Sequence, residues 1–432
     1  MVRVLATPMA LAALLAAHAA AALPSTSSAR PTDEEVLRSR APWAIPMGVA
    51  VVVLVLTQIV SRVRWALAEA KSASVPSVLQ RNERLERLAE TSAQLHPVGA
   101  RVLTKTRGVA KVLAYDESAR TYEVAIEGSE SATLDEADIE VPEVAEFVVY
   151  PIKSCAGTRL DTAEITAKGV RHDRLWMFAD EDGKFISQRR YAKMALIAPK
   201  LVPSMESPTA IVLTAPGMDD LEVPILDETH GAAANATVWS SQVVAVDQGD
   251  KAAAWINAYL ADVRVERQFR FLRVSDSFKR ATDPKYAPNY ETGFADGFPF
   301  LVTLEASLAE LNASLDNPVL MNRFRPNIVL KGAPAFADEH WNCFLIGGLV
   351  FRNVKPCSRC NLPCVDPATG ISDPNREPSK TLTRTRNGEL LGFIGGKKFE
   401  CYFGSNVVAE RVGTLTAGDC VKVLTLKKEI VA

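Results

Sequence analysis

The sequence predicts an α+β fold that is mostly β, and three observations support this prediction. From residue 144 onward, short runs of alternating apolar and polar residues are interrupted by Gly, Pro, Asn and Asp, which is typical of strands joined by turns. In this part of the chain, only residues 251–261 and 304–315 show helical periodicity. At 432 residues the chain is long enough for two or three domains, each with its own apolar core.

The first 61 residues contain two apolar segments. Residues 1–23 are rich in alanine and resemble a secretory signal or an organelle-targeting segment. Residues 43–61 are just long enough to cross a bilayer as a transmembrane helix. Trp43 lies at the start of this run, and Arg62 and Arg64 follow it, so the positive-inside tendency favours a cytosolic C-terminal bulk. A cleaved leader followed by a buried core helix is the alternative.

Two more segments precede the main fold. Residues 77–95 have the amphipathic pattern of a polar helix, which we interpret as a stalk. Residues 97–141 alternate in short strands and predict a small barrel resembling SH3-like or Tudor-like modules. Such barrels bind peptides when they carry an aromatic cage. Tyr115 and Tyr122 are the only aromatic residues in this segment, so a spacer and a peptide reader both stay open.

The rest of the chain predicts two β-rich domains, residues 144–270 and 285–427. The first opens with a buried-type strand, Phe147–Lys153, which ends in a Lys-Ser-Cys-Ala-Gly loop. Further strands are expected in runs that carry arginines or alternate in polarity, namely residues 169–178, 185–190, 322–330, 346–353 and 414–426.

Composition excludes several classes of function. Basic residues (49) and acidic residues (51) nearly balance, which argues against a nucleic-acid binder. Seven cysteines give no disulfide framework and favour a reducing compartment. The five histidines form no HxxxH or HExxH pair, so a histidine-built zinc site is not expected. GxGxxG, Walker and GxSxG motifs are absent from the sequence.

Three cysteines lie close together near the C-terminal end, at a strand end that passes into a loop. Cys357, Cys360 and Cys364 have a CxxCxxxC spacing. A zinc or iron–sulfur site would need a fourth ligand from elsewhere, such as Cys343, Cys401 or His340. Burial of the thiols as small apolar groups is the other interpretation. Cys360 differs because it follows Arg359, whose positive charge favours the thiolate form needed for metal ligation.

Basic residues at predicted strand ends and loop starts form a second pattern. Singly, each is typical of a solvated surface. As a set they could hold the phosphate of an anionic cofactor, because guanidinium and ammonium groups are strong phosphate donors. The set is Lys153, Arg174, Arg189, Arg323, Arg325 and Arg359, with Ser154, Asn327 and Ser358 as neutral hydrogen-bonding neighbours.

The order of these motifs resembles the MOSC domain proteins with an N-terminal MOSC beta-barrel, and within them the amidoxime-reducing components. The resemblance covers residues 144–427 and leaves out residues 97–141. It rests on Val149-Tyr-Pro-Ile-Lys-Ser-Cys, Asp173-Arg-Leu-Trp, Phe294-Ala-Asp-Gly, Glu305-Ala-Ser-Leu, Arg323-Phe-Arg-Pro-Asn-Ile, and Cys357-Ser-Arg-Cys followed by Val365-Asp-Pro-Ala-Thr-Gly.

The resemblance implies a molybdenum–pterin cofactor with Cys360 as the metal ligand and catalytic residue. It implies that the pterin and its phosphate contact Lys153, Ser154, Arg174, Arg323, Asn327, Ser358 and Arg359. Arg189 and Arg325 are added to this predicted cofactor-binding set because they belong to the pattern of basic residues described above. Where the family often has two threonines, this chain has Pro363 and Cys364, which leaves the polarity on the substrate side open.

The function implied is that of a membrane-anchored oxidoreductase. Its substrates would be amidoximes, hydroxylamines or N-hydroxylated bases, and its electrons would come from cytochrome b5 and its NADH-dependent reductase. The mitochondrial outer membrane, with the catalytic part facing the cytosol, is the expected location, and the endoplasmic reticulum is the alternative. Pyridoxal phosphate binding is a further family-level association.

Two other functions remain open. One is a non-catalytic sulfur-carrier or cofactor-binding module, as in the C-terminal part of molybdenum cofactor sulfurases. Those proteins carry a pyridoxal-phosphate domain for which this chain has no room. The other is a membrane-tethered adaptor that recruits a partner through residues 97–141.

Overall fold

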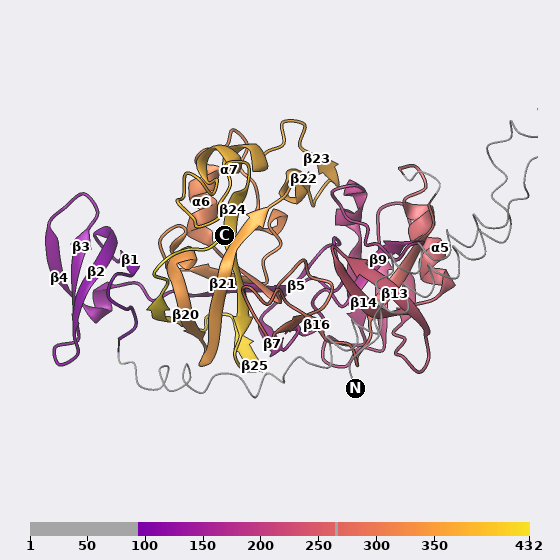
Figure 1. The fold of residues 1–432 in the computed structure, drawn as a ribbon, viewed down its shortest axis with the longest axis horizontal. Coiled ribbons are helices and arrows are strands. Elements are labelled where there is room, and N and C mark those ends of the chain that lie inside the picture. Colours follow the sequence, from indigo (N-terminus) through magenta and orange to yellow (C-terminus); the bar gives the residue numbers. More distant parts are fainter. Residues whose placement is uncertain (1–93, 264–266) are drawn as a thin grey trace, which may run out of the picture. The chain divides into compact units, whose positions relative to one another are not determined.

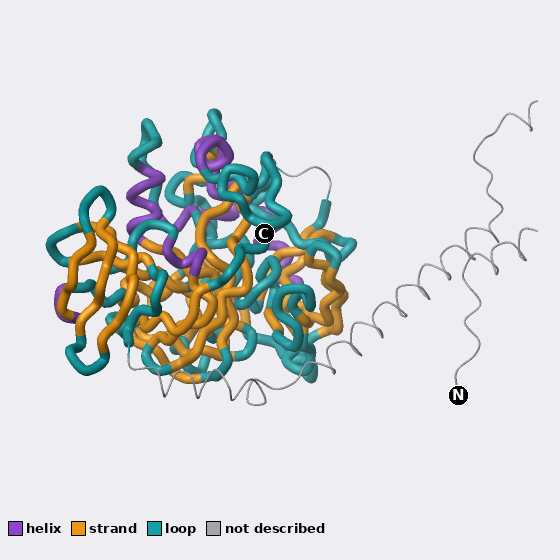
Figure 2. The backbone as a smooth tube through the Cα atoms, turned by 60° about the vertical axis from the view of Figure 1, so that its left-hand side comes forward, coloured by secondary structure: helices purple, strands orange, loops and turns teal. Residues whose placement is uncertain are grey.

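Strands far outnumber helices in the described chain of this computed structural model, and loops join them, as Figure 2 shows. The structure describes residues 94–263 and 267–432. The predicted segments 1–23 and 43–61, and all but the end of 77–95, lie outside these residues. Within the described residues, no helix is long and apolar enough to cross a membrane. The prediction of a mostly β fold is confirmed. The α-helices in the described part are α5 (Asp250–Tyr259), α6 (Glu305–Asn312) and α7 (Ser379–Thr385).

Residues 101–135 form an antiparallel sheet of their own. Its strands are β1 (Arg101–Thr104), β2 (Gly108–Asp116), β3 (Thr121–Ile126) and β4 (Ser131–Asp135), paired in chain order. Alternate residues such as Val112, Tyr122 and Val124 are fully buried, as expected for strands with one apolar face. The short strands predicted for this segment are confirmed, whereas an SH3-like or Tudor-like identity stays a prediction.

The largest sheet has eight strands, and its long strand β21 runs beside β24 in Figure 1. β18 and β19 are parallel, and the other neighbours are antiparallel. In spatial order the strands are β26 (Val421–Leu426), β20 (Trp341–Ile346), β21 (Leu349–Arg359), β24 (Cys401–Ala409), β18 (Phe300–Leu304), β19 (Ile328–Lys331), β5 (Glu143–Val149) and β6 (Thr158–Leu160).

The two faces of this sheet differ in chemistry. Phe147, Phe300, Ile328, Phe351 and Val407 belong to one buried apolar cluster. A small sheet of β25 (Gly413–Thr416), β7 (Thr162–Thr166) and β8 (Gly169–Val170) packs on the same cluster through residues such as Leu415 and Ile165. Because side chains alternate along a strand, the neighbours of these core residues point to the opposite face.

That opposite face carries the polar row on which the site is built. Lys355 of β21 pairs with Asn406 of β24, and Asn406 pairs with Leu301 of β18. Asn327, just before β19, continues the row, since its amide N–H donates to the Leu301 carbonyl at 2.9 Å. Cross-strand neighbours share a face, so the ends of four segments present side chains to one side.

The other β-rich part of the chain builds on two smaller sheets. One has the order β13 (Ala232–Val238), β14 (Ser241–Asp247), β15 (Phe269–Val274), β9 (Trp176–Asp180), and the other consists of β10 (Ala198–Val202), β11 (Ala210–Thr214) and β12 (Leu221–Pro224). α5 packs its buried Ile256 into the cluster that also holds Trp176 and Phe271.

Three strand predictions are wrong in detail. Residues 185–190 turn instead of extending, because the amides of Arg190 and Tyr191 both donate to the Ser187 carbonyl at 2.9 Å. The predicted strand 169–178 is divided into β8 and β9 by residues with left-handed backbone, His172 and Arg174. The predicted strand 322–330 begins as the 3₁₀ turn η4 (Met321–Arg323) and becomes β19 only at Ile328.

Short elements complete the described chain. They are the strands β16 (Arg280–Ala281), β17 (Glu291–Thr292), β22 (Val365–Asp366) and β23 (Ile371–Ser372), and the 3₁₀ turns η2 (Glu136–Asp138), η3 (Ala192–Leu196), η5 (Ala337–His340) and η6 (Leu362–Cys364).

Phe351 tests the apolar core of the large sheet. It is fully buried and its ring contacts those of Phe300 and Phe344, with centroids 5.7 and 5.8 Å away. We expect Phe351→Ala to lower the free energy of unfolding by about 3–5 kcal/mol, because a large cavity replaces the ring. Phe399→Ala is the matched control: its side chain is 75% exposed, so the change should stay within about 0.5 kcal/mol. Urea unfolding measures both, and equal losses would contradict this assignment of the core.

Candidate functional site

A cavity of about 260 Å³ lies over the polar row of the large sheet. Its walls come from the loop after β5, the turns before β9 and after Phe185, the segment before β18 and the end of β21. Nine of the ten residues predicted for the site line it, namely Lys153, Ser154, Arg174, Arg189, Arg325, Asn327, Ser358, Arg359 and Cys360. The structure therefore gathers residues that are more than 200 positions apart in the sequence.

Cys360 lies at the end of β21 with an exposed side chain facing this cavity. β21 carries two register shifts against β24, one between Asn353 and Lys355 and one between Pro356 and Ser358. Such bulges re-aim side chains, which lets consecutive residues of β21 reach the same cavity.

Arg359 contacts a different thiol from the one predicted. Its Nη1 donates to Sγ of Cys357 at 3.1 Å, and its Nη2 donates to the Phe324 carbonyl at 2.9 Å. Residues 357 and 359 are two apart in a strand and share a face, whereas Cys360 lies beyond the strand end. Cys357 also lines the cavity, so its interpretation as a purely structural thiol is incomplete.

Cys364 does not face the cavity. It is buried, and its Sγ lies 3.2 Å from Ser379 Oγ and 3.3 Å from the Arg376 carbonyl. In the described part of the chain no three His, Cys, Asp or Glu side chains come close enough to hold a metal ion. The CxxCxxxC cysteines thus form no zinc or iron–sulfur site there, and a metal at this cavity would need ligands from a cofactor.

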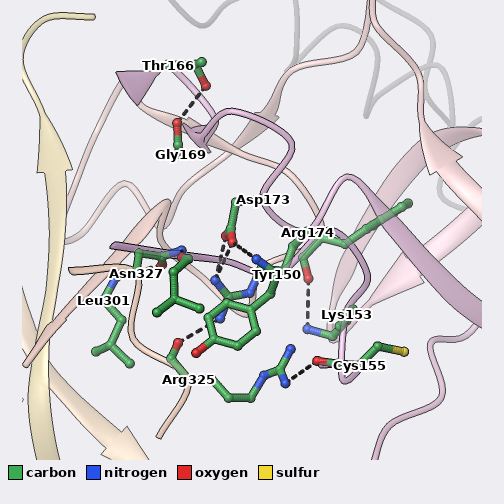
Figure 3. Close-up of polar contacts among 12 residues, drawn as sticks. Tyr150, Lys153, Cys155, Thr166, Gly169, Asp173, Arg174, Leu301, Arg325 and Asn327 are labelled. Atoms are coloured by element: carbon green, nitrogen blue, oxygen red, sulfur yellow. Dashed lines mark hydrogen bonds and ion pairs between the residues drawn. The ribbon is translucent and has the colours of Figure 1, made fainter. Parts of the chain in front are cut away.

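Tyr150 supports two of the cavity arginines, and Figure 3 shows its ring between their guanidinium groups. The guanidinium carbons of Arg174 and Arg325 each lie 4.2 Å from the ring centroid. Beneath them, buried Asp173 accepts hydrogen bonds from Arg174 Nη1, at 2.8 and 2.7 Å, and from the Tyr150 amide at 2.9 Å. Arg174 Nη2 donates to the Arg325 carbonyl at 2.9 Å, which ties the two segments together.

The backbone at this cluster is strained. Ser154, Arg174 and Arg325 have positive φ angles of 66°, 47° and 59°. Each such conformation costs a non-glycine residue about 1–3 kcal/mol and is retained where the surroundings enforce it. Gly157 is required for a related reason, because a Cβ there would lie 2.5 Å from a ring carbon of Tyr150. Because Ser154, Arg174 and Arg325 all line one cavity, their strained backbone indicates a functional site there.

Lys153 and Asp296 form an ion pair at the cavity wall. The Nζ–Oδ1 distance is 2.5 Å, and the ammonium also donates to the Phe294 carbonyl at 2.9 Å. Burial lowers the pKa of Lys153, although Asp296 opposes the shift. Burial alone would raise the pKa of Asp296, but the Lys153 ammonium and a hydrogen bond from Trp239 Nε1 lower it overall.

Arg280 holds the segment that carries Asp296. Its guanidinium donates to three carbonyls of this segment, those of Gly293, Ala295 and Asp296. Burial lowers the Arg280 pKa to about 10. No motif in the sequence singles out Arg280, and this residue acts on the site through the backbone that it positions.

The other predicted site residues lie as follows. Asn327 lines the cavity, but its side-chain amide also bridges two strands. Its Oδ1 accepts a hydrogen bond from the Leu301 amide of β18, and its Nδ2 donates to the Val148 carbonyl of β5, both at 3.2 Å. Arg189 lines the cavity with its guanidinium 4.7 Å from the Trp239 ring. Arg323 is not among the lining residues, and it forms an ion pair with Asp366 at 3.2 Å in the loop beyond Cys360.

Charge defines what this cavity can bind. Six cationic side chains line it, those of Lys153, Arg174, Arg189, Arg325, Lys355 and Arg359, and Asp296 is the single carboxylate among the lining residues. Two buried nitrogens, Nη2 of Arg325 and Nε of Arg359, have no hydrogen-bond partner in the described chain. Burial, with Arg174 nearby, lowers the Arg325 pKa to about 10. Such a cavity fits an anion that supplies the missing acceptors.

These residues also fit a pterin cofactor that carries a phosphate and a metal. The unpartnered guanidinium nitrogens and excess cations suit the phosphate, and the exposed thiol of Cys360 offers one soft ligand at the cavity edge. Several lining residues were not predicted, namely Phe185, Ser187, Asp296, Phe298, Lys355 and Asn406. Only Asp296 had a signal in the sequence, since it belongs to the Phe294-Ala-Asp-Gly motif.

Inorganic phosphate tests the anion site without any cofactor. We expect it to raise the melting temperature of the cofactor-free chain, since a ligand of the folded state stabilises that state. Arg189→Met should weaken phosphate binding about tenfold, because it removes a charge-assisted contact. Arg190→Met is the matched control: the neighbouring arginine is exposed and does not line the cavity. Thermal shifts over a phosphate titration measure both, and equal weakening would contradict this site.

Comparisons with known proteins match both halves of the main fold. A model of the MOSC N-terminal beta barrel domain matches residues 141–263, and a model of the MOSC domain matches residues 289–422. Mitochondrial amidoxime reducing component 2 of Bos taurus is 33% identical over 291 residues, covering 65% of this chain and 82% of the relative. Mitochondrial amidoxime-reducing component 1 of Homo sapiens is 33% identical over 298 residues, covering 66% and 84%.

Solved structures give weaker matches. The YuaD protein of Bacillus subtilis is 10% identical with a TM-score of 0.27, covering 65% of this chain and 94% of that one. YiiM of Geobacillus stearothermophilus is 12% identical with a TM-score of 0.22, covering 29% and 54%.

The domain and relative matches decide the family. Both domain types occur in the expected order, and the relatives are matched over more than four-fifths of their length. These matches give no support to the pyridoxal phosphate association. The chain belongs to the MOSC domain proteins with an N-terminal MOSC beta barrel, alongside the mitochondrial amidoxime-reducing components.

Proposed function

We propose that the chain is a molybdenum-cofactor reductase of N-hydroxylated compounds. Its family, in which relatives are named amidoxime-reducing components, supports a reductase. The observation that carries the proposal is the exposed thiol of Cys360 at the edge of a cavity with six cations and one carboxylate. A thiol is a soft metal ligand, and the lining cations can bind a phosphate. Together they suit a metal that is held by a pterin carrying a phosphate group.

Each residue of the cavity has a defined task in this proposal. Cys360 is the protein ligand of the metal. Arg174, Arg325 and Arg359, which line the cavity, bind the anionic part of the pterin, and Arg325 Nη2 and Arg359 Nε are the buried nitrogens that lack a partner in the described chain. When bound, the cofactor supplies two-electron redox chemistry, and the protein supplies binding and orientation.

The overall reaction needs protons as well as electrons. Reduction of an N–OH group to N–H consumes two electrons and two protons and releases water. Lys153 Nζ donates a hydrogen bond to Asp296 Oδ1 at 2.5 Å, and the Asp296 side chain is 62% exposed. We assign to this pair the exchange of protons between the cavity and solvent, since one member is buried and the other reaches water.

The substrates and partners follow from the family likeness and belong to the proposal. Amidoximes, hydroxylamines and N-hydroxylated bases are the substrate classes. The sequence carries no dinucleotide-binding motif of its own, so electrons would arrive from another protein, and the family likeness implies cytochrome b5 and its NADH-dependent reductase as the donors. We infer a place at the mitochondrial outer membrane from the names of the relatives and from the apolar segment 43–61, with the endoplasmic reticulum as the alternative.

Cys360→Ala tests the assignment of the ligand. We expect the variant to lose at least about 100-fold in kcat/KM for benzamidoxime, because disturbing even outer contacts of a metal site costs 10–100-fold. Its molybdenum content should fall as well. Cys364→Ala is the matched control, since this thiol points to Ser379 and away from the cavity; it should keep both activity and metal.

Metal analysis of the purified chain and steady-state assays decide the outcome. A wild-type protein without molybdenum, or a Cys360→Ala variant with full activity, would refute the proposed function. Equal loss in both cysteine variants would show that general disruption of the loop, rather than loss of a ligand, explains the result.

A further inference from the structure

A second, larger cavity of about 890 Å³ adjoins the cofactor cavity. Its walls come from the loop after Cys360, from α7 and from the loop that follows α7. Five cationic side chains and one carboxylate line it, namely Arg359, Arg376, Lys380, Arg384 and Lys398, with Glu389. The whole chain has a formal net charge of −2, so this surface is a local excess of positive charge.

The second cavity reaches the backbone of Cys360. Arg359 lines both cavities, and Asn361, the residue after Cys360, lines the second. Ser379 Oγ, also in the lining, donates to the Cys360 carbonyl at 3.2 Å. A molecule bound in this second cavity would therefore lie directly beside the segment that carries the metal ligand.

Two large apolar side chains are exposed in the lining. Leu390 is 64% exposed and Phe399 is 75% exposed. Lys380, Arg384 and Lys398 line the same cavity. Exposed aromatic and aliphatic side chains together with arginines are typical of protein–protein interfaces, and the added lysines give the surface its positive charge.

The loop that presents these anchors has a fixed backbone. A Cβ on Gly388 would lie 2.5 Å from Cα of Gly396, so two glycines allow the loop ends to meet. The Gly388 amide donates to the Glu400 carbonyl at 3.1 Å, and Phe393 packs its ring edge against Tyr402 at 5.2 Å. A preformed surface of this kind binds a partner without first losing its own conformational entropy.

We propose that this basic surface is the docking site of an acidic electron-carrier protein. The inference rests on the proposed function and names the place where the electrons enter. Electron tunnelling weakens steeply with distance, so a donor must bind beside the metal, and this surface meets the Cys360 segment. A small anion is the weaker interpretation, because the cations here are spread over an open surface with exposed apolar groups between them.

The test reverses the charge of three surface residues. The variant Lys380→Glu, Arg384→Glu, Lys398→Glu is compared with Lys105→Glu, Arg107→Glu, Lys111→Glu. The second set has the same residue types, and all three are exposed, Lys105 and Arg107 in the turn between β1 and β2 and Lys111 on β2. Both are made in the full-length chain loaded with cofactor, and molybdenum content and melting temperature confirm that each is intact. The probe is the soluble haem domain of cytochrome b5.

We expect the first variant to raise KM for reduced cytochrome b5 about tenfold or more at low salt, and to lose most of the dependence on ionic strength, because electrostatic steering is removed. Turnover with reduced methyl viologen, a small cationic donor that needs no docking surface, should stay within about twofold of wild type. The control variant should match wild type in both assays. A rise in KM shared by both variants, or seen in neither, would overturn the docking site.

A binding titration separates this inference from the proposed function. Oxidised haem domain is titrated onto wild type and the two variants at low salt. Weaker binding by the first variant alone supports the docking surface even where no N-hydroxylated substrate is turned over. Equal binding by all three chains overturns it, whatever the activities. Failure of methyl viologen to support any reduction by wild type would count against the proposed function instead.

Discussion

The cavity brings six positive charges together with one lining carboxylate, and the rest of the site depends on how their repulsion is offset. Tyr150 places its ring against two of the guanidinium groups, and cation–π contacts of this kind are attractive even when solvent is excluded. Buried Asp173 neutralises Arg174 from below, and the carbonyls of Cys155 and Phe324 accept from Arg325 and Arg359. These contacts leave Nη2 of Arg325 and Nε of Arg359 buried without a hydrogen-bond partner in the described chain, so an anion in the cavity would complete the balance of charge.

The backbone geometry makes this arrangement possible. The residues with left-handed backbone at Ser154, Arg174 and Arg325 turn three segments toward one cavity, and the two bulges in β21 bring its last residues to the same place. The strain is held because each segment is anchored in a sheet with a fully buried core. The end of β21 contributes to two surfaces. Cys360 faces the cavity over the large sheet, while its carbonyl and its neighbour Asn361 reach the basic surface at α7.

Sequence patterns predicted the strand-rich fold and nine residues of the cavity, because alternation and motif order are local signals. They could not separate Arg323 from Arg325, which are two positions apart; the 3₁₀ turn and the positive φ at Arg325 send the side chains to different places. The ion-pair partner of Lys153 could not be predicted from the sequence either, because Asp296 is 143 positions away and their pairing depends on tertiary structure. The contact of Arg359 with Cys357 could have been predicted, had the strand been continued through residue 359 and its alternation followed.

The central claim is that Cys360 ligates a metal held in this cavity, and X-ray absorption at the molybdenum K-edge tests it most directly. The spectrum of the loaded wild-type chain should contain the two dithiolene sulfurs of the pterin and one further sulfur. Cys360→Ser should show one sulfur fewer, while Cys357→Ser, whose thiol lines the same cavity, should keep the wild-type number. An unchanged sulfur number in Cys360→Ser, or its loss in Cys357→Ser instead, would contradict the account.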